Sequence, residues 1–284
     1  MTIEQYSLLD SGNRRKLEQI GPFRLIRPAM NAFWGPQLPP AEWEQAAGVF
    51  TRNASGGGTW QWHRQLPESW QVEWGGFILK VKPTAFGHIG FFAEQHRNWQ
   101  WLQKTITAMP GEITCLNLFG YSGVASMAMA AVGARVTHVD AARGMNEWGK
   151  ENMLLNPDIP QNVRWITDDA VKFVEREIRR GRRYNGIVLD PPSFGRGAKG
   201  QVWKIEDSIN RLLALCRKAL DTKRPFFVML SGHTPGFSPI TLERLLMQHF
   251  GPGDINSGEM TIPDSKAQLL PAGNSATLYC QPKR

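Results

Sequence analysis

From about residue 112 onward, short apolar runs alternate with longer segments in which hydrophobic residues recur at helical spacing. The clearest runs cover residues 114–118, 135–139, 185–189 and 226–230. Runs of this length predict buried strands, and their alternation with helices is typical of a parallel sheet covered on both faces. Residues 259–262 and 276–280 predict a closing antiparallel pair. We therefore expect an α/β fold with a doubly wound, mostly parallel sheet.

Residues 1–85 follow a different pattern. Their apolar residues lie in short β-type runs at 23–26, 60–63, 70–74 and 77–81, separated by turn residues. Eight of the eleven tryptophans precede residue 102, and most of them are expected to build a small β core, because large aromatic side chains bury much area. We predict a β-rich, tryptophan-rich N-terminal extension over residues 1–85 and the α/β domain over residues 86–284.

The first apolar run of the α/β part breaks into a glycine turn, with Gly120 and Gly123 ahead of a small-residue helix pattern. Such a turn brings backbone N–H groups and a helix N-terminus close to a ligand. Asp140 ends the next strand about 20 residues later, where a carboxylate that holds a ribose belongs, so an adenosine-bearing cofactor is expected. A nicotinamide site would need G-x-G-x-x-G, and only G-x-x-G is present.

A later apolar strand ends at Asp190, Pro191 and Pro192, followed by Ser193 and Phe194. The proline pair stops the strand, fixes φ and removes two backbone donors. It leaves carbonyls and a carboxylate at the strand's C-terminal end. Such an edge accepts hydrogen bonds from a planar amine.

These segments, taken in series, resemble class I S-adenosylmethionine-dependent methyltransferases, and most closely the branch that contains the bacterial 23S rRNA methyltransferases. The resemblance implies a Rossmann-like sheet of seven strands and S-adenosylmethionine as the cofactor, and it covers most of the chain. The matching segments are residues 114–123 (TCLNLFGYSG), Val139 and Asp140 with Trp148, Asn152 and Asn156, residues 169–173 (DAVKF), residues 187–194 (IVLDPPSF), and the upstream residues 90–99 (GFFAEQHRNW).

The resemblance also implies roles for residues around the cofactor. Asp140 would hold the ribose hydroxyls and Asp169 the adenine amine. The backbone of the turn would lie close to the cofactor. Residues 90–99 would line the methionine end. The full set of expected cofactor-binding residues is Phe92, Gln95, Asn117, Phe119, Gly120, Gly123, Asp140, Asp169 and Asp190.

On the acceptor side, the resemblance implies that the catalytic residues are Asp190, Pro191 and Phe194. Asp190 and the Pro191 carbonyl would orient an acceptor amine, and Phe194 would stack on the acceptor. In the amine-methylating families the aromatic residue directly follows the proline pair, whereas here Ser193 intervenes. The form D-P-P-[ST]-F occurs in the guanine-N7 enzyme of the rRNA branch.

Methylation of a pyrimidine carbon needs a cysteine thiolate that attacks the ring. The 5-methylcytosine members of the branch carry that cysteine after the fifth strand, where residues 229–234 of this chain read MLSGHT. Cys115, Cys216 and Cys280 fall at positions that predict burial. A nitrogen or oxygen acceptor, methylated without a covalent cysteine intermediate, is therefore expected. The six histidines show no ligand spacing, so no metal site is expected.

The net charge of +8 suits a polyanionic partner without requiring one. In the N-terminal extension, aromatic faces are able to stack on bases while basic side chains meet phosphates. We favour a core role for most of the tryptophans. The basic candidates for phosphate contacts are Arg14, Arg15, Lys16, Arg24 and Arg27.

No apolar run reaches about 18 residues and the N-terminus shows no signal segment, so a cytoplasmic protein without a membrane span is expected. The leading hypothesis is an S-adenosylmethionine-dependent methyltransferase acting on rRNA at a base nitrogen. The alternatives are a methyltransferase for a protein or small molecule, and, from another class, a nicotinamide oxidoreductase or an inactive cofactor-binding module. The sequence leaves the oligomeric state open.

Overall fold

The computed structural model describes residues 5–53, 57–196 and 202–281, and the chain divides into two compact units. The first unit comprises residues 1–96 together with 261–272, and the second comprises residues 97–260 together with 273–284. The C-terminal hairpin therefore contributes its tip to the first unit and its base to the second.

This division by packing differs from the predicted boundary at residue 85, which remains a proposal. Residues 86–96 belong to the first unit, where the ring of Phe91 packs against that of Tyr6 with the centroids 5.4 Å apart. The hairpin tip joins the same unit through a parallel bridge between Leu8 and Asp264. Neither contact is visible in the sequence, because each joins residues far apart along the chain.

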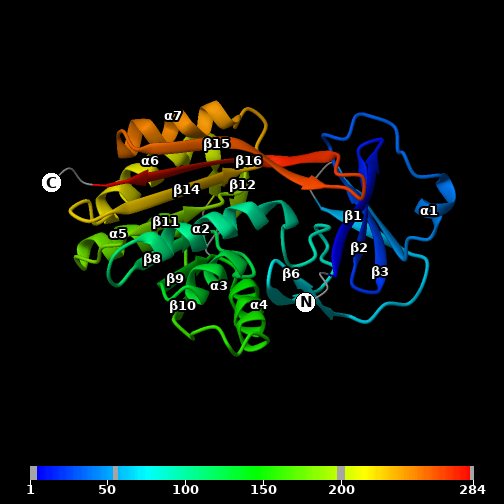
Figure 1. Ribbon diagram of the computed structural model, residues 1–284, viewed down its shortest axis with the longest axis horizontal. Helices are drawn as coiled ribbons and strands as arrows, with labels where there is room; N and C mark the ends of the chain where they lie inside the picture. Colours follow the sequence, from blue (N-terminus) through cyan, green and yellow to red (C-terminus); the bar gives the residue numbers. More distant parts are fainter. Residues whose placement is uncertain (1–4, 54–56, 197–201, 282–284) are drawn as a thin grey trace. The chain divides into compact units, whose positions relative to one another are not determined.

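The first unit is built mainly from β-strands (Figure 1). Five of them form a sheet in the order β1-β2-β3-β4-β5, in which β3 and β4 run parallel and the other neighbours antiparallel, and β6 and β7 form a separate hairpin. The β-rich N-terminal region is therefore confirmed. Its elements are β1 (Tyr6–Gly12), β2 (Arg15–Ile20), β3 (Phe23–Pro28), α1 (Pro40–Glu44), β4 (Gly48–Arg52), β5 (Gly58–Trp62), β6 (Trp70–Trp74), β7 (Phe77–Val81) and the 3₁₀ helix η1 (Ala93–Gln95).

Strands β1, β2 and β4 were not predicted, and β2 shows why. Its inward position Glu18 is fully buried and accepts two hydrogen bonds from Arg27 of β3, at 2.7 and 2.8 Å. Burial alone would raise the pKa of Glu18. The positive charges of Arg27 and Lys16 outweigh that effect and lower the pKa to about 2. A buried charge persists only when it is paired, and a charged residue at a core position hides the strand's alternation.

The second unit contains a seven-stranded sheet in the order β10-β9-β8-β11-β14-β16-β15. The first five strands of this order are parallel, and β16 pairs antiparallel with β14. The predicted mostly parallel sheet and its closing pair are thus confirmed. The elements are α2 (His96–Ala108), β8 (Thr114–Leu118), α3 (Val124–Ala131), β9 (Arg135–Asp140), α4 (Arg143–Leu154), β10 (Val163–Thr167), α5 (Ala170–Arg179), β11 (Gly186–Leu189), β12 (Phe194–Arg196), β13 (Val202–Lys204), α6 (Ile205–Ala219), β14 (Phe226–Gly232), α7 (Pro239–Phe250), β15 (Asp254–Pro263) and β16 (Leu269–Cys280).

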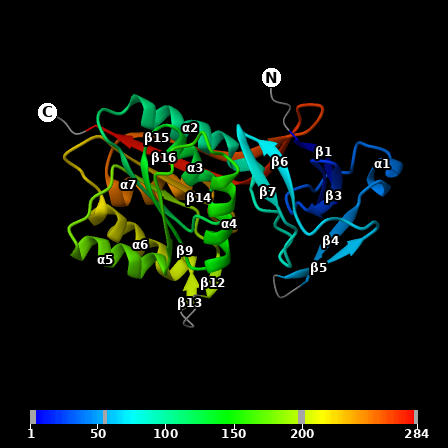
Figure 2. The same ribbon diagram turned by 90° about the horizontal axis from the view of Figure 1, so that it is seen from below.

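Helices cover both faces of this sheet, and Figure 2 shows α2 and α3 on one side and α5 and α6 on the other. Successive residues of a strand point to opposite faces. Leu116 and Leu118 of β8 accordingly belong to a buried cluster with residues of α5, α6 and α7. The intervening Asn117 points to the opposite face, where it bonds to Ser126 of α3.

The C-terminal ends of β8, β9 and β11 are neighbours at one edge of the sheet. The strand order reverses between β8 and β11, and ligands of open α/β sheets bind at such a switch point. The glycine turn follows β8, Asp140 ends β9, and Asp190 follows β11. The fold therefore brings the main predicted site residues to one place. Among the described residues no helix is both long and apolar enough to cross a membrane.

Candidate active site

The turn after β8 has an unusual backbone. Phe119, Tyr121 and Gly123 adopt φ angles of 58°, 51° and 84°, and positive φ is uncommon outside glycine. Backbone bonds of 3.1 and 3.0 Å close the turn, from Gly120 N to the Val139 carbonyl and from Gly123 N to the Gly120 carbonyl. Strained backbone that leads directly into a helix N-terminus suits the approach of a ligand to main-chain N–H groups.

Packing beneath the turn explains its two glycines. A Cβ on Gly120 would lie 2.3 Å from the His138 ring, and one on Gly123 would lie 2.6 Å from the Trp165 ring. Both distances are far inside the contact distance of carbon atoms. The glycines predicted to allow a ligand's approach are therefore also required by the core under them.

Three buried polar side chains from β8, α3 and β9 support the turn from below. Asn117 Nδ2 donates to Ser126 Oγ at 2.9 Å, and Ser126 Oγ lies 2.9 Å from Nδ1 of His138. The Asn117 side chain thus points into the core, so any ligand contact of this predicted residue uses its backbone. Burial lowers the pKa of His138 to about 3, against an opposing effect of the Tyr121 backbone. The imidazole is consequently neutral at neutral pH.

We expect His138→Gln to reduce the acid sensitivity of folding. Because the pKa of His138 falls from 6.5 in the unfolded chain to about 3 in the folded one, the unfolded state binds the extra proton, and stability is lost as the pH falls below about 6.5. At about 1.4 kcal/mol per pH unit, the loss reaches roughly 2 kcal/mol at pH 5. Urea unfolding at pH 7 and pH 5 measures it. His63→Gln, at an exposed histidine, is the control, and equal pH slopes for wild type and His138→Gln would contradict the expectation.

Asp140 links the turn to the loop before α4. Its Oδ2 accepts a hydrogen bond from Tyr121 N and its Oδ1 one from Ala142 N, both at 2.9 Å. Burial raises the pKa of Asp140, and the two backbone bonds oppose that rise. A carboxylate oxygen accepts more than one hydrogen bond. The side chain is therefore held in place and retains capacity for hydroxyl donors.

The spaced residues Trp148, Asn152 and Asn156 have a structural role here. Asn152 Nδ2 donates to the Ser122 carbonyl of the turn at 3.0 Å, and Asn156 Nδ2 donates to the Asn152 carbonyl at 2.7 Å. The Trp148 ring lies 6.0 Å from the Tyr121 ring. Residues four apart share one helix face, so the motif supports the glycine turn from α4.

Asp169 is the N-cap of α5, where its Oδ1 accepts a hydrogen bond from Lys172 N at 2.9 Å. An aspartate at this position satisfies a backbone donor of the first helical turn. The structure therefore gives Asp169 a role in starting the helix. Its contact with an adenine amine stays a prediction.

Sequence reasoning missed Asn146, in the first turn of α4. It is 3% exposed, and its Nδ2 donates to the Asp140 carbonyl at 3.1 Å and to Thr167 Oγ1 at 3.2 Å. Its Oδ1 has no partner among the described residues. Buried acceptors are nearly always satisfied, so this oxygen, at the ends of β9 and β10, fits a donor from a bound ligand. An asparagine early in a helix carries no signal of such a role in the sequence.

Asp190 is held by the neighbouring strand β14. Ser231 Oγ donates to Asp190 Oδ1 at 2.8 Å, and Ser231 is 2% exposed. From the sequence, no role was predicted for Ser231 in the stretch 229–234. The structure shows that a hydroxyl from this stretch fixes the orientation of the Asp190 carboxylate.

Two further side chains hold the loop after Asp190. Trp203 Nε1 donates to the Pro192 carbonyl at 2.7 Å, and the hydroxyls of Ser193 and Thr234 lie 2.6 Å apart. Ser193, which interrupts the amine-methylating pattern, thus ties the loop to the end of β14. Phe194 follows on β12 and is 53% exposed. Its stacking on an acceptor stays a prediction.

The remaining residues considered in the sequence belong to other parts of the chain. Phe92 and Gln95 belong to the first unit, at the start and end of η1, so they are not part of the geometry described for the sheet edge and their role stays a prediction. Cys115 and Cys216 are fully buried, and burial raises the pKa of both thiols. Cys280 is only partly buried, contrary to expectation, because it lies at the end of β16. It pairs with Phe226, at the opposite end of β14 from Ser231.

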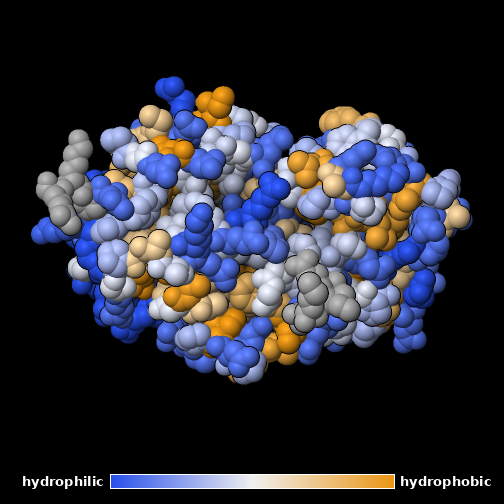
Figure 3. Space-filling view, viewed as in Figure 1, coloured by the Kyte–Doolittle hydropathy of each residue, from blue (hydrophilic) through white to orange (hydrophobic). Residues whose placement is uncertain are grey.

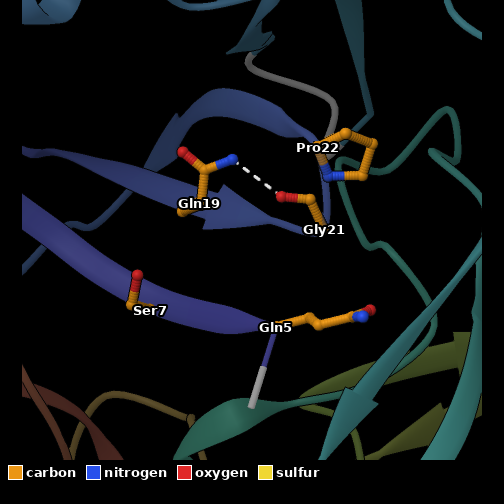
Figure 4. Close-up of a pocket in the computed structure, with 5 residues that line it drawn as sticks. All are labelled: Gln5, Ser7, Gln19, Gly21 and Pro22. Atoms are coloured by element: carbon orange, nitrogen blue, oxygen red, sulfur yellow. Dashed lines mark hydrogen bonds between the residues drawn. The ribbon is translucent and has the colours of Figure 1, made fainter. Parts of the chain in front are cut away.

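A pocket in the first unit is lined by five uncharged residues, and none of the predicted site residues is among them. The Gln19 side-chain amide donates to the Gly21 carbonyl at 2.7 Å. Over the described ranges, no three His, Cys, Asp or Glu side chains gather as metal ligands. The pocket residues are Gln5, Ser7, Gln19, Gly21 and Pro22 (Figure 4).

The mostly parallel sheet, with a glycine turn and a carboxylate at its switch point, defines a Rossmann-like domain for an adenosine cofactor. Residues 51–217, more than half of the chain, match the S-adenosylmethionine-dependent methyltransferase family. The chain belongs to this family, and S-adenosylmethionine is its cofactor. The family match contradicts the alternative hypothesis of a nicotinamide-dependent oxidoreductase.

Individual relatives agree with this assignment. The crystal structure of the S-adenosylmethionine-dependent methyltransferase from Agrobacterium tumefaciens matches with a TM-score of 0.90 and 36% identity, over 100% of this chain and 92% of that one. The ribosomal RNA large subunit methyltransferase K/L of Syntrophotalea carbinolica is 30% identical over 50% of this chain and 19% of its own length. The enzyme of that name from Pseudoalteromonas atlantica is 29% identical over 53% of this chain and 20% of its own length. The chain thus spans about a fifth of these two relatives.

Proposed function

We propose that the protein transfers a methyl group from S-adenosylmethionine to a base nitrogen of rRNA, without a covalent cysteine intermediate. The observation that carries the proposal is the Asp190 loop at the switch point, fixed by Ser231 beside the glycine turn. The names of the K/L relatives and the net charge of +8 support an rRNA substrate. An rRNA substrate implies a cytoplasmic location as part of the same proposal.

The residues of the sheet edge fit the cofactor. Asp140 has two oxygens held by backbone donors and further acceptor capacity for the ribose hydroxyls. The unsatisfied Oδ1 of Asn146 offers an additional acceptor. In the proposal, the Asp169 carboxylate accepts a hydrogen bond from the adenine amine. The backbone from Asn117 through Phe119 to Gly123 lies close to the cofactor. Phe92 and Gln95 line the pocket for its methionine end.

On the acceptor side, the cofactor supplies a methyl group already activated by its sulfonium charge, so the protein mainly positions the acceptor and excludes water. Asp190 and the Pro191 carbonyl orient the acceptor amine. The Pro192 carbonyl accepts a hydrogen bond from the Trp203 indole, which holds the loop in place beside Asp190. Phe194 stacks on the acceptor ring, and the bond between Ser193 and Thr234 keeps the loop in position.

We expect methyl transfer to survive replacement of each cysteine. A covalent mechanism needs a thiolate at the acceptor, whereas Cys115 and Cys216 are buried with raised pKa values and Cys280 lies at the opposite end of β14. Cys115→Ala, Cys216→Ala and Cys280→Ser should retain turnover, with losses that follow thermal stability. Single-turnover assays with RNA measure this. Complete loss of turnover in a folded variant, or a denaturation-resistant protein–RNA adduct, would contradict it.

The acceptor class is tested by methyl transfer from radiolabelled S-adenosylmethionine to separate fractions of total RNA, protein and small molecules. The proposal expects label in the rRNA. Label only in the protein or small-molecule fraction would favour the alternative methyltransferase and overturn the rRNA assignment.

A further inference from the structure

The structure sorts the basic residues of the N-terminal extension into paired and unpaired groups. Arg27 and Lys16 both contact the buried Glu18, at 2.7 and 3.0 Å. Arg24 contacts Glu42 at 2.8 Å. These three cations are paired with carboxylates of the first unit and are therefore poorer candidates for contacts with phosphate than cations that have no such partner.

Arg14 and Arg15 differ from the others. Both are exposed, and neither has a carboxylate within ion-pair distance among the described residues. Each guanidinium instead lies over an aromatic ring, Arg14 at 4.9 Å from the Phe33 centroid and Arg15 at 5.5 Å from the Trp43 centroid. Trp43 is buried, whereas Phe33 is 72% exposed. Phe33 and Arg14 thus present an aromatic ring and an unneutralised cation to solvent together.

The backbone holds this pair firmly. Asn13 N donates to the Trp34 carbonyl and Arg14 N to the Ala32 carbonyl, both at 2.7 Å, and Ala29 N donates to the Arg14 carbonyl at 2.9 Å. These bonds fasten the tip of the β1–β2 hairpin to the segment that carries Phe33. A ring presented by a fixed segment loses little conformational freedom when a ligand binds.

Two neighbours of Phe33 in this segment are also exposed large apolar residues, Met30 at 53% and Trp34 at 39%. On the face drawn in Figure 3, hydrophobic residues gather in several places among hydrophilic ones. A single exposed apolar residue needs no explanation. Here, however, an aromatic ring on a fixed segment lies beside the unpaired guanidinium of Arg14, and the next residue, Arg15, carries a second one. Such a set matches what a nucleotide offers, a planar base and a phosphate. A chain with net charge +8 also attracts a polyanion.

We propose that Phe33, with Arg14 and Arg15, forms a platform that binds a single-stranded segment of RNA. A base stacks on Phe33, and the two guanidinium groups contact its flanking phosphates. This inference rests on the proposed rRNA methyltransferase function and adds a substrate-holding surface in the first unit. Binding there depends on the ring and on the two charges, and it does not require the cofactor.

The test measures binding of the full chain to a fluorescein-labelled, single-stranded RNA of 12 nucleotides by fluorescence anisotropy at several salt concentrations. Phe33→Ala is expected to weaken binding about tenfold, in line with the loss of one base–aromatic stack. Arg14→Gln should lower the slope of log affinity against log salt by about 0.7, as expected for one lost phosphate contact. Affinity for S-adenosylhomocysteine should remain unchanged in both variants.

Phe86→Ala is the matched control, since Phe86 is 60% exposed in the same unit. Thermal unfolding verifies that the variants are folded. The platform is overturned if Phe33→Ala binds the RNA as wild type does, or if Phe86→Ala weakens binding equally. Loss of RNA affinity in Phe33→Ala alone supports it. If wild type methylates no rRNA, the proposed function fails independently, because the anisotropy measurement needs no methyl transfer.

Discussion

Asp190→Asn is expected to lower the rate of methyl transfer about 100-fold or more while leaving the affinity for S-adenosylmethionine within a few-fold of wild type. The substitution keeps an oxygen that can accept the 2.8 Å hydrogen bond from Ser231, so the loop should retain its position. It removes the negative charge and one acceptor where the proposal places the acceptor amine. Misplacing a reacting atom by about 1 Å can cost about 100-fold in rate.

Single-turnover transfer to an in-vitro transcript of large-subunit rRNA, measured beside calorimetry with the cofactor, separates the two effects. Asp254→Asn, at an exposed aspartate in β15, is the matched control. A parallel loss of cofactor affinity and rate would place Asp190 among the residues that hold the cofactor. No change in either would show that the acceptor lies elsewhere.

Asp140→Ala is expected to weaken S-adenosylhomocysteine binding at least tenfold. The carboxylate is the proposed acceptor for the ribose hydroxyls, and hydrogen bonds to a charged group contribute roughly 1.5–3 kcal/mol. The variant should also lose some stability, because the backbone N–H groups of Tyr121 and Ala142 lose their acceptor. The Tyr121 bond is partly buried and the Ala142 bond is exposed, so the loss should be smaller than the roughly 1–3 kcal/mol that a fully buried unsatisfied donor costs.

Calorimetry with S-adenosylhomocysteine and thermal unfolding measure the two effects separately. Asp158→Ala, at an exposed acid in the loop after α4, is the control. Asp140→Asn should lie between wild type and Asp140→Ala in stability, since one acceptor oxygen remains. Unchanged affinity in the folded Asp140→Ala protein would contradict the assignment of this carboxylate to the ribose.

The second unit was predictable because its strands are buried on both faces and therefore read as continuous apolar runs. The turn, Asp140 and Asp190 follow three of these runs, and neighbouring parallel strands bring them to one edge. The first unit was less predictable, since Glu18 occupies a core position and is stabilised by Arg27 from the next strand. Such a pairing joins residues whose contact is fixed only by the fold.

The same limit applies to the site. The orientation of Asp190 depends on Ser231, 41 residues away, and the Ser193 hydroxyl meets Thr234 at an equal separation. Asn146 is a candidate ligand contact because it is buried and its Oδ1 has no partner among the described residues, and the sequence shows neither property. The sequence predicts which residues reach the edge of the sheet, whereas the hydrogen bonds that orient them follow from tertiary packing.

The central claim, methyl transfer to a base nitrogen of rRNA, is tested most directly by nucleoside mass spectrometry. Large-subunit rRNA transcribed in vitro is incubated with the protein and S-adenosylmethionine carrying a deuterated methyl group, then digested to nucleosides. The account predicts a labelled nucleoside whose fragmentation places the methyl group on a base nitrogen, formed by wild type and strongly reduced in Asp190→Asn. A label on a base carbon or on a ribose oxygen, or rRNA without label beside a labelled protein fraction, would contradict it.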